Sequence, residues 1–158
     1  MGNGDRGIGS GDIGMKDFIE TRIIEAVRKL LSGRVNEILK ESPFGIPIIE
    51  FGDYCGGSAI VPVIALSSCE RTEKERIIRL DAYSVTVSIN FPETSDGELY
   101  CYAYSGAIGR AIYNDPTLGG VTDRTVSTTM LYTPPKKPYC GEGWRLQITI
   151  QIVVNAGQ

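Results

Sequence analysis

The chain has 158 residues, of which 42% are hydrophobic and 22% charged, a composition typical of one compact globular domain. Its formal net charge of -3 excludes a general electrostatic attraction to nucleic acid or to an anionic membrane, and no apolar run reaches the roughly 18 residues of a transmembrane helix. The first residues lack the basic and then apolar order of a secretory signal, so we expect a protein that is cytoplasmic at synthesis.

Six glycines stand between Met1 and Gly14, so we expect a flexible arm over residues 1–14 and a single folded domain over residues 15–158. Gly2–Gly7 and Gly9–Gly14 both match the G-x-G-x-x-G pattern of dinucleotide sites. That pattern binds pyrophosphate only where it joins a strand to a helix, and no strand is predicted before either copy. We therefore interpret both matches as chance.

Apolar residues recur at helical spacing between Met15 and Leu31, with charged residues on the opposite face. This pattern predicts an amphipathic helix that lies on the rest of the domain. Two ends are consistent with the sequence. Gly33 ends the helix, or the apolar stripe extends it as far as Glu41, before Pro43.

Two short strands are predicted next, at Ile46–Phe51 and at about Ile60–Ser68, separated by a glycine-bearing loop. Pro62 in the second favours an edge strand or a strand start, because proline has no N–H to donate to a neighbouring strand. The charged run Glu70–Arg76 is predicted to form the tip of a hairpin. The strand that follows, Ile77–Phe91, has the cleanest apolar and polar alternation in the chain, so one face meets the core and the other meets water or a partner.

A second helix is predicted to run from a turn at Thr94–Gly97 to about Tyr113. Gly106 and Gly109 are costly inside a helix and indicate a close approach of its backbone to a neighbouring element. Thr125–Thr133 and Arg145–Val154 then read as a β-hairpin. Helices and strands that do not follow a regular parallel repeat predict an α+β fold: a mostly antiparallel sheet of about four to five strands with two main helices packed on it.

No residue pattern predicts catalysis, and we expect neither catalytic residues nor a cofactor nor a metal. The chain has no histidine, which removes the commonest general base, and it has neither a nucleophile elbow nor a phosphate-binding loop. Glu50 and Asp53 near a strand end are the strongest candidates for a cation site, as in a small metal-dependent hydrolase, but two carboxylates are a weak signal. Against that hypothesis, we favour a protein that is not an enzyme.

The four cysteines are widely spaced and contain no C-x-x-C pair. We interpret them as reduced structural residues in preference to an all-thiolate zinc site. A disulfide between Cys55 and Cys140 remains an alternative. The four cysteines are Cys55, Cys69, Cys101 and Cys140.

Basic and aromatic residues do not alternate as they do in an RNA-binding sheet, so we expect no sequence-specific nucleic-acid binding. The most basic local element is the loop Pro134–Tyr139, in which Pro134, Pro135 and Pro138 stiffen the backbone beside Lys136 and Lys137. An ordinary solvated loop is one interpretation. The other is a docking loop between protein subunits, because a stiff loop loses little entropy on binding.

The order of elements in the last third of the chain resembles the tail-terminator and tail-completion proteins of long-tailed bacteriophages. The helix ends in the segment Asp115-Pro116-Thr117-Leu118-Gly119-Gly120, a short run leads to the first strand of a hairpin, and an aromatic-proline turn follows at Tyr132–Pro135, with Gly143-Trp144-Arg145-Leu146 opening the last strand. The motif residues are Asp115, Pro116, Leu118, Gly119, Gly120 and Trp144. A weaker resemblance extends over about four-fifths of the chain.

This resemblance implies a structural virion protein of the tail or neck, assembled in the bacterial host cytoplasm. It implies a homo-oligomeric ring, usually hexameric, that caps the tail tube, stops its elongation and provides the joint to the head connector. The implied partners are further copies of the chain, the tail tube protein, the head-tail connector protein and, where the tail is contractile, the sheath. A head-to-tail stopper in the neck is the alternative.

Within that framework two surfaces are candidates for partner contact: the charged hairpin and the Pro-Lys loop. The long glycine-rich arm departs from the family pattern. The candidate interface residues are Arg71, Glu73, Lys74, Glu75, Arg76, Pro134, Pro135, Lys136, Lys137, Pro138 and Tyr139.

Overall fold

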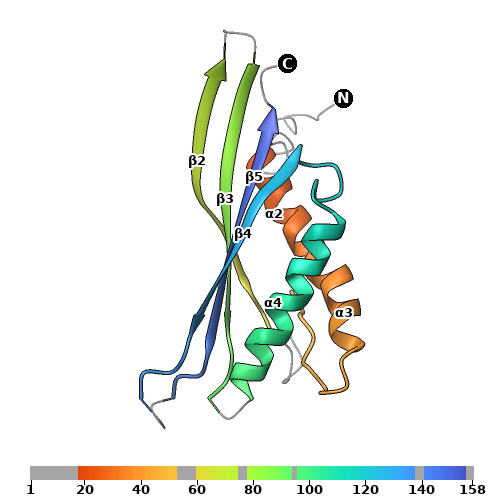
Figure 1. Cartoon of the computed structure of the whole chain (residues 1–158), viewed down its shortest axis with the longest axis vertical. Coiled ribbons are helices and arrows are strands. Elements are labelled where there is room, and N and C mark those ends of the chain that lie inside the picture. Colours follow the sequence, from red (N-terminus) through yellow and green to blue (C-terminus); the bar gives the residue numbers. More distant parts are fainter. Residues whose placement is uncertain (1–17, 53–59, 75–77, 94–95, 138–140, 156–158) are drawn as a thin grey trace, which may run out of the picture.

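The computed structural model describes residues 18–52, 60–74, 78–93, 96–137 and 141–155. The predicted glycine-rich arm lies outside these residues. In chain order (Figure 1) the elements are α2 (Ile19–Leu30), a π-helical turn η2 (Leu31–Val35), α3 (Asn36–Lys40), β2 (Val63–Lys74), β3 (Ile78–Asn90), α4 (Gly97–Asn114), β4 (Arg124–Thr133) and β5 (Arg145–Asn155).

The strands form one four-stranded antiparallel sheet in the order β2-β3-β5-β4, and the helices cover one of its faces (Figure 1). This arrangement confirms the α+β prediction, and the sheet has four strands in the part of the chain that the structure describes. No helix within the described ranges is long and apolar enough to cross a membrane.

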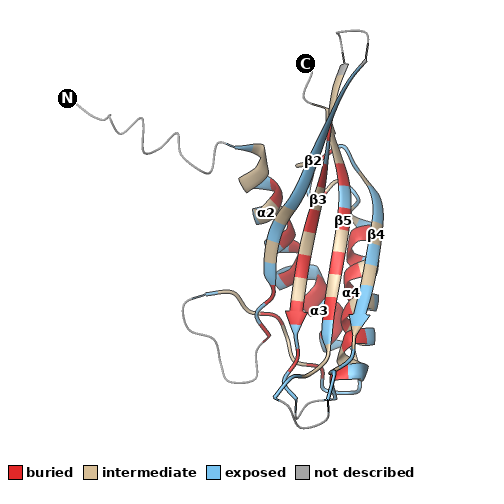
Figure 2. Ribbon diagram, turned by 90° about the vertical axis from the view of Figure 1, so that its left-hand side faces the viewer, coloured by how far each residue is buried: buried red, intermediate tan, exposed pale blue. Residues whose placement is uncertain are grey.

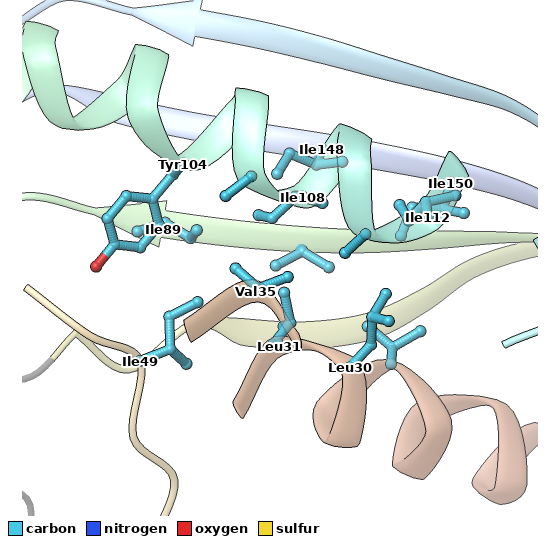
Figure 3. Close-up of a cluster of buried hydrophobic side chains, with 14 of the residues drawn as sticks. Leu30, Leu31, Val35, Ile49, Ile89, Tyr104, Ile108, Ile112, Ile148 and Ile150 are labelled. Atoms are coloured by element: carbon cyan, nitrogen blue, oxygen red, sulfur yellow. The ribbon is translucent and has the colours of Figure 1, made fainter. Parts of the chain in front are cut away.

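Alternation along β3 and β5 builds the core. Every second side chain of β3 from Tyr83 to Ile89, and of β5 from Leu146 to Ile152, is buried beneath the helices (Figure 2). Residues of α4 such as Tyr104, Ile108 and Ile112 belong to the same core and lie over these two rows (Figure 3). Burial of this kind stabilises the fold by about 25 cal/mol for each Å² of apolar surface removed from water, so the predicted period of two has a direct energetic origin.

The first helix continues through Gly33 and ends at Lys40, which confirms the longer of the two predicted ends. The continuation passes through the π-helical turn, where one extra residue per turn shifts the buried face. Leu31 and Val35 in the turn are therefore as buried as Val27 in α2.

The predicted strand Ile46–Phe51 is wrong. This segment forms only a single parallel bridge, Ile49 to Ile60. The backbone of this segment hydrogen-bonds to a side chain at Ile49. The side-chain amide of Asn36 donates to the carbonyl oxygen of Ile49 at 2.7 Å and accepts from the N–H of Ile49 at 2.8 Å. Because this buried amide satisfies the backbone groups of Ile49, the segment packs on the helix without joining the sheet.

The hairpin tip is shorter than predicted. Glu70–Lys74 lies inside β2, in register with β3 from Ala82 to Ile78, and so most of the charged run is strand. The interpretation of Pro62 is confirmed, because β2 begins at Val63 and is an edge of the sheet.

The expected close backbone approach at Gly106 and Gly109 is also wrong. A Cβ at Gly106 would meet nothing within 4 Å, and one at Gly109 would meet only the methyl of Met130 at 3.8 Å. The tight contacts occur at other glycines. A Cβ at Gly97 would lie 2.9 Å from Trp144, and one at Gly143 would lie 2.0 Å from the carbonyl oxygen of Phe91.

Candidate functional site

The two predicted docking surfaces lie at opposite ends of the sheet (Figure 1). The β2–β3 hairpin projects past Asn155 at the end of β5, whereas the loop between β4 and β5 leaves the sheet beside Asn90 at the end of β3. With 13 residues in β3, these ends are separated by roughly 43 Å at the rise of an antiparallel strand. One subunit therefore presents two distant surfaces along its long axis.

At the hairpin end, Arg71 and Glu73 are exposed residues of β2. Glu75 and Arg76 lie outside the described residues, and Lys74 is described only as backbone. Arg71 is tied to the sheet by an ion pair, with its Nε 2.9 Å from Oδ1 of Asp81. It is thus held in place on the surface.

Asp81 is the centre of this charged cluster and is only 2% exposed. Besides Arg71, it contacts Arg79, whose Nη2 lies 3.3 Å from Oδ2 of Asp81. Burial by itself raises the pKa of Asp81, but the hydrogen bonds and positive charges of the two arginines outweigh it and lower the pKa below its ordinary value. The carboxylate is therefore ionised in the folded protein, and it organises two arginines at the hairpin end.

At the loop end, Pro134, Lys136 and Lys137 are exposed and Pro135 is half-buried, while Pro138 and Tyr139 lie outside the described residues. A shallow cavity of about 390 Å³ opens at the base of the loop, lined by both cationic and acidic side chains. Its charged lining residues are Lys136, Glu142 and Arg145.

The base of this loop is anchored to the start of α4. The N–H of Phe91 donates to the carbonyl oxygen of Trp144 at 2.9 Å, and the Trp144 side chain packs against Gly97. Gly143 passes so close to Phe91 that no larger residue fits without a backbone shift. The Pro-Lys loop therefore projects from a well-packed base, which is the property that a docking loop requires.

The segment Asp115–Gly120 forms the turn that connects α4 to β4. Both carboxylate oxygens of Asp115 accept from the N–H of Gly119, at 3.0 and 2.9 Å, and Thr117 accepts from Gly120. Leu118 is buried and has a φ of 51°, a left-handed conformation that is uncommon outside glycine. Five of the six motif residues thus form one closed turn, with Thr125 of β4 bonded back to the carbonyl oxygen of Pro116 at 2.8 Å, whereas Trp144 lies at the base of the Pro-Lys loop.

A groove of about 920 Å³ runs between this turn and the first helix, and the sequence patterns do not predict it. Four cations and three carboxylates line it, and two of the cations have acidic neighbours within the helix: Arg28 lies 3.7 Å from Glu25, and Arg34 lies 3.3 Å from Glu37. The only sequence feature that corresponds to this groove is the charged face of the first helix, and that pattern is equally typical of an ordinary solvent-exposed helix face. The charged lining residues are Arg22, Arg28, Lys29, Arg34, Glu25, Glu37 and Asp115.

The two cysteines among the described residues differ in their burial. Cys101 is buried and Cys69 is exposed, both as free thiols, while Cys55 and Cys140 lie outside the described residues. Burial, with the nearby Glu98, raises the pKa of Cys101 to about 11, so this thiol is protonated and acts in packing.

Among the described residues no group of three or more acidic or cysteine side chains has the geometry of a metal site. Of the proposed cation pair, Glu50 follows the bridge at Ile49, and its N–H donates to the carbonyl oxygen of Ile60 at 3.0 Å. Asp53, the other carboxylate of the pair, lies outside the described residues.

The face of the sheet opposite the helices carries small polar side chains. Ser84, Thr86 and Ser88 of β3 lie beside Gln151, Thr149 and Gln147 of β5, and all of these except Gln151 are half-buried. At the two edges of this face, Val63 of β2 is 63% exposed and Leu131 of β4 is 56% exposed. This confirms the predicted alternation and leaves an uncharged central surface.

Comparisons with known proteins leave the family open: no protein-family model matches the chain, and neither does any curated protein.

Proposed function

We propose that the chain is a structural protein of a bacteriophage tail, forming a ring that caps the tail tube, stops its elongation and joins it to the head connector. The observation that carries this proposal is the placement of the two candidate docking surfaces at opposite ends of one continuous sheet. A ring between two other assemblies needs one contact surface toward each of them. A sheet whose strands all run between the two ends supplies both.

The turn at Asp115–Gly120 supports the same proposal. Its backbone is closed by side-chain hydrogen bonds, and the buried Leu118 holds it against the body of the subunit. The turn lies near the hairpin end of the sheet. Shortly after it, the N–H of Asp123 donates to the carbonyl oxygen of Val153 at 2.9 Å, close to the end of β5 beside the hairpin. The motif that suggests the family is thus a stable part of the fold beside one of the candidate surfaces.

The purified chain should form rings, and native mass spectrometry with negative-stain images of the full chain at micromolar concentration measures this directly. A strictly monomeric chain, alone and when mixed with tail tubes, would count heavily against the proposal.

The position in the particle is tested by electron microscopy of phage particles produced without this protein. Overlong tails are expected if the ring ends tube growth. Finished tails beside leaking heads would instead identify the alternative, a head-to-tail stopper.

A further inference from the structure

The sheet has two open edges, β2 on one side and β4 on the other. In the part of the chain that the structure describes, no further strand continues the sheet beyond either of them. An edge strand presents a row of N–H and C=O groups that another strand can pair with, and proteins commonly protect such edges with charged side chains or proline.

Both edges lack charge and proline over matching lengths, and each is interrupted by a single β-bulge, between Leu66 and Ser68 in β2 and between Thr125 and Ser127 in β4. β4 carries no charged residue and no proline from Thr125 to Thr133, and β2 carries none from Val63 to Cys69. Figure 2 shows both strands largely exposed along their length. An uncharged open edge of this kind favours pairing with another strand.

The strand directions allow the two edges to pair with each other between copies of the chain. Successive strands of the sheet are antiparallel, so β2 and β4 run in opposite directions. If one copy is placed beside the next with its sheet continuing, β4 meets the neighbour's β2 in antiparallel orientation. The two bulges lie one row apart in the aligned strands, so the pairing is interrupted there and is regular on either side of them.

The register then matches residue to residue. Following the pairs across the sheet, Val63 aligns with Ser88, Gln147 and finally Leu131. In the same way Glu70 aligns with Ala82, Val153 and finally Arg124. A neighbouring copy placed without axial shift therefore brings Leu131 beside Val63 and Arg124 beside Glu70.

Both matches are complementary. Val63 and Leu131 are two of the large apolar side chains most exposed on the strands, and each would cover the other. Glu70 and Arg124 are exposed residues of opposite charge, and neither forms an ion pair with another described residue. Cross-strand pairs of these kinds stabilise sheets.

We propose that copies of this chain associate head to tail by pairing β4 of one subunit with β2 of the next, with Leu131 beside Val63 and Arg124 beside Glu70. The proposal deepens the ring assembly proposed above and rests on it. Such a contact uses two different surfaces, so repetition closes into a ring where the rotation between subunits allows it and otherwise extends into a filament.

Cysteine cross-linking of the full chain tests the register. Ala65 and Thr129 are both exposed and belong to one aligned row, so the double variant Ala65→Cys/Thr129→Cys places two thiols opposite each other across the contact. Within one subunit these positions stand three strand spacings apart, roughly 14 Å, which is too far for a disulfide. Mild oxidation should therefore give covalent dimers and higher multimers on a non-reducing gel, reversed by a thiol reductant.

The matched control is Ala65→Cys/Thr133→Cys, in which the second thiol lies four residues further along β4, displaced by roughly 13 Å. The single variants Ala65→Cys and Thr129→Cys give the background from native cysteines. Multimers of the Ala65/Thr129 variant well above these three controls support the proposal.

Two other outcomes overturn the proposal and separate it from the proposed function. Rings in native mass spectra without Ala65/Thr129 cross-links would exclude edge pairing and leave the ring intact. A chain that stays monomeric and uncross-linked at tens of micromolar would exclude edge pairing and count against the ring as well.

Discussion

At the scale of single residues, Asp81 shows how a buried charge is retained. The carboxylate is almost fully buried, yet two arginines that reach toward solvent supply its hydrogen bonds. A buried charge is tolerated only where such partners offset its lost hydration. The sequence has the alternating charges of this hairpin but no sign of which carboxylate is buried.

Replacing this carboxylate should cost stability in a pH-dependent way. We expect Asp81→Asn to lower the free energy of unfolding by about 1–3 kcal/mol near neutral pH. Because folding lowers the pKa of Asp81, its contribution is fully present above the unfolded-state pKa of about 3.9 and is lost as the pH falls through the folded pKa. Urea unfolding at neutral pH and near pH 2.5 should show the gap between wild type and variant shrinking in acid.

Glu73→Gln is the control for Asp81→Asn, because Glu73 is an exposed carboxylate on the same hairpin. It should change stability by less than about 0.5 kcal/mol. An Asp81→Asn gap that is equal at both pH values would contradict the ion-pair explanation.

Two glycines should respond in opposite directions to the same substitution. Gly143→Ala forces a Cβ to within 2.0 Å of the carbonyl oxygen of Phe91, so the base of the Pro-Lys loop must shift, at a cost of about 3 kcal/mol. Gly106→Ala adds a Cβ in open space on a helix and should stabilise the fold by about 0.5–1 kcal/mol. Urea unfolding of both variants measures the two changes in stability. If the unfolding midpoints of the two variants shifted by the same amount, the difference in space around the two glycines would be contradicted.

At the scale of elements, the turn after α4 depends on one acidic side chain. The Asp115 carboxylate accepts the N–H of Gly119, and the left-handed residues that follow allow the chain to reverse toward β4. Asp side chains commonly stabilise turns in this way, by bonding to backbone groups a few residues further along the chain.

Asp115→Ala should weaken this turn by removing the acceptor. We expect a loss of about 1 kcal/mol in unfolding free energy and faster hydrogen exchange at the Gly119 amide. Asp115→Asn keeps an acceptor oxygen and should retain part of the protection, which makes it the matched control. Unchanged exchange at Gly119 in the alanine variant would show that the turn is held by the backbone alone.

At the scale of the whole molecule, the arrangement of edges and ends decides what the protein can assemble into. The helices cover one sheet face, the opposite face is uncharged at its centre, and no further described strand pairs with the edges β2 and β4. The proposed docking surfaces lie at the two ends of the sheet, and the proposed subunit contacts lie along its two side edges (Figure 1). One subunit can therefore make both kinds of contact at the same time.

Charge reversal across the proposed subunit contact should be rescued by a second reversal. Glu70→Lys or Arg124→Glu each places like charges together and should weaken assembly about two- to five-fold, the scale of an exposed ion pair. The double variant restores opposite charges and should recover assembly, as measured by sedimentation velocity across a concentration series.

The control for this pair is Glu41→Lys, which reverses an exposed carboxylate at the end of α3. Glu41 belongs to neither edge strand of the sheet, so assembly should be unaffected. A double variant no better than the single ones would place the contact elsewhere on the subunit.

The sequence by itself determined the two central strands and the two main helices, together with their buried faces. Alternation along Ile77–Phe91 and Arg145–Val154 predicts the two central strands, and helical spacing predicts both helices, because a period of 2 or 3.6 follows from the local backbone and one buried face. The candidate surfaces at the hairpin and the Pro-Lys loop were likewise identified by their local charge and proline content, and their role remains a prediction.

Only the tertiary structure decided which segments pair and which residues align. Ile46–Phe51 has the composition of a strand, but Asn36 holds it on a helix, an outcome that depends on a side chain distant in the sequence. The alignment of Glu70 with Arg124 passes through three successive strand pairings. Register of this kind is set by the packing of the complete sheet on its helices, and no local pattern in the chain contains it.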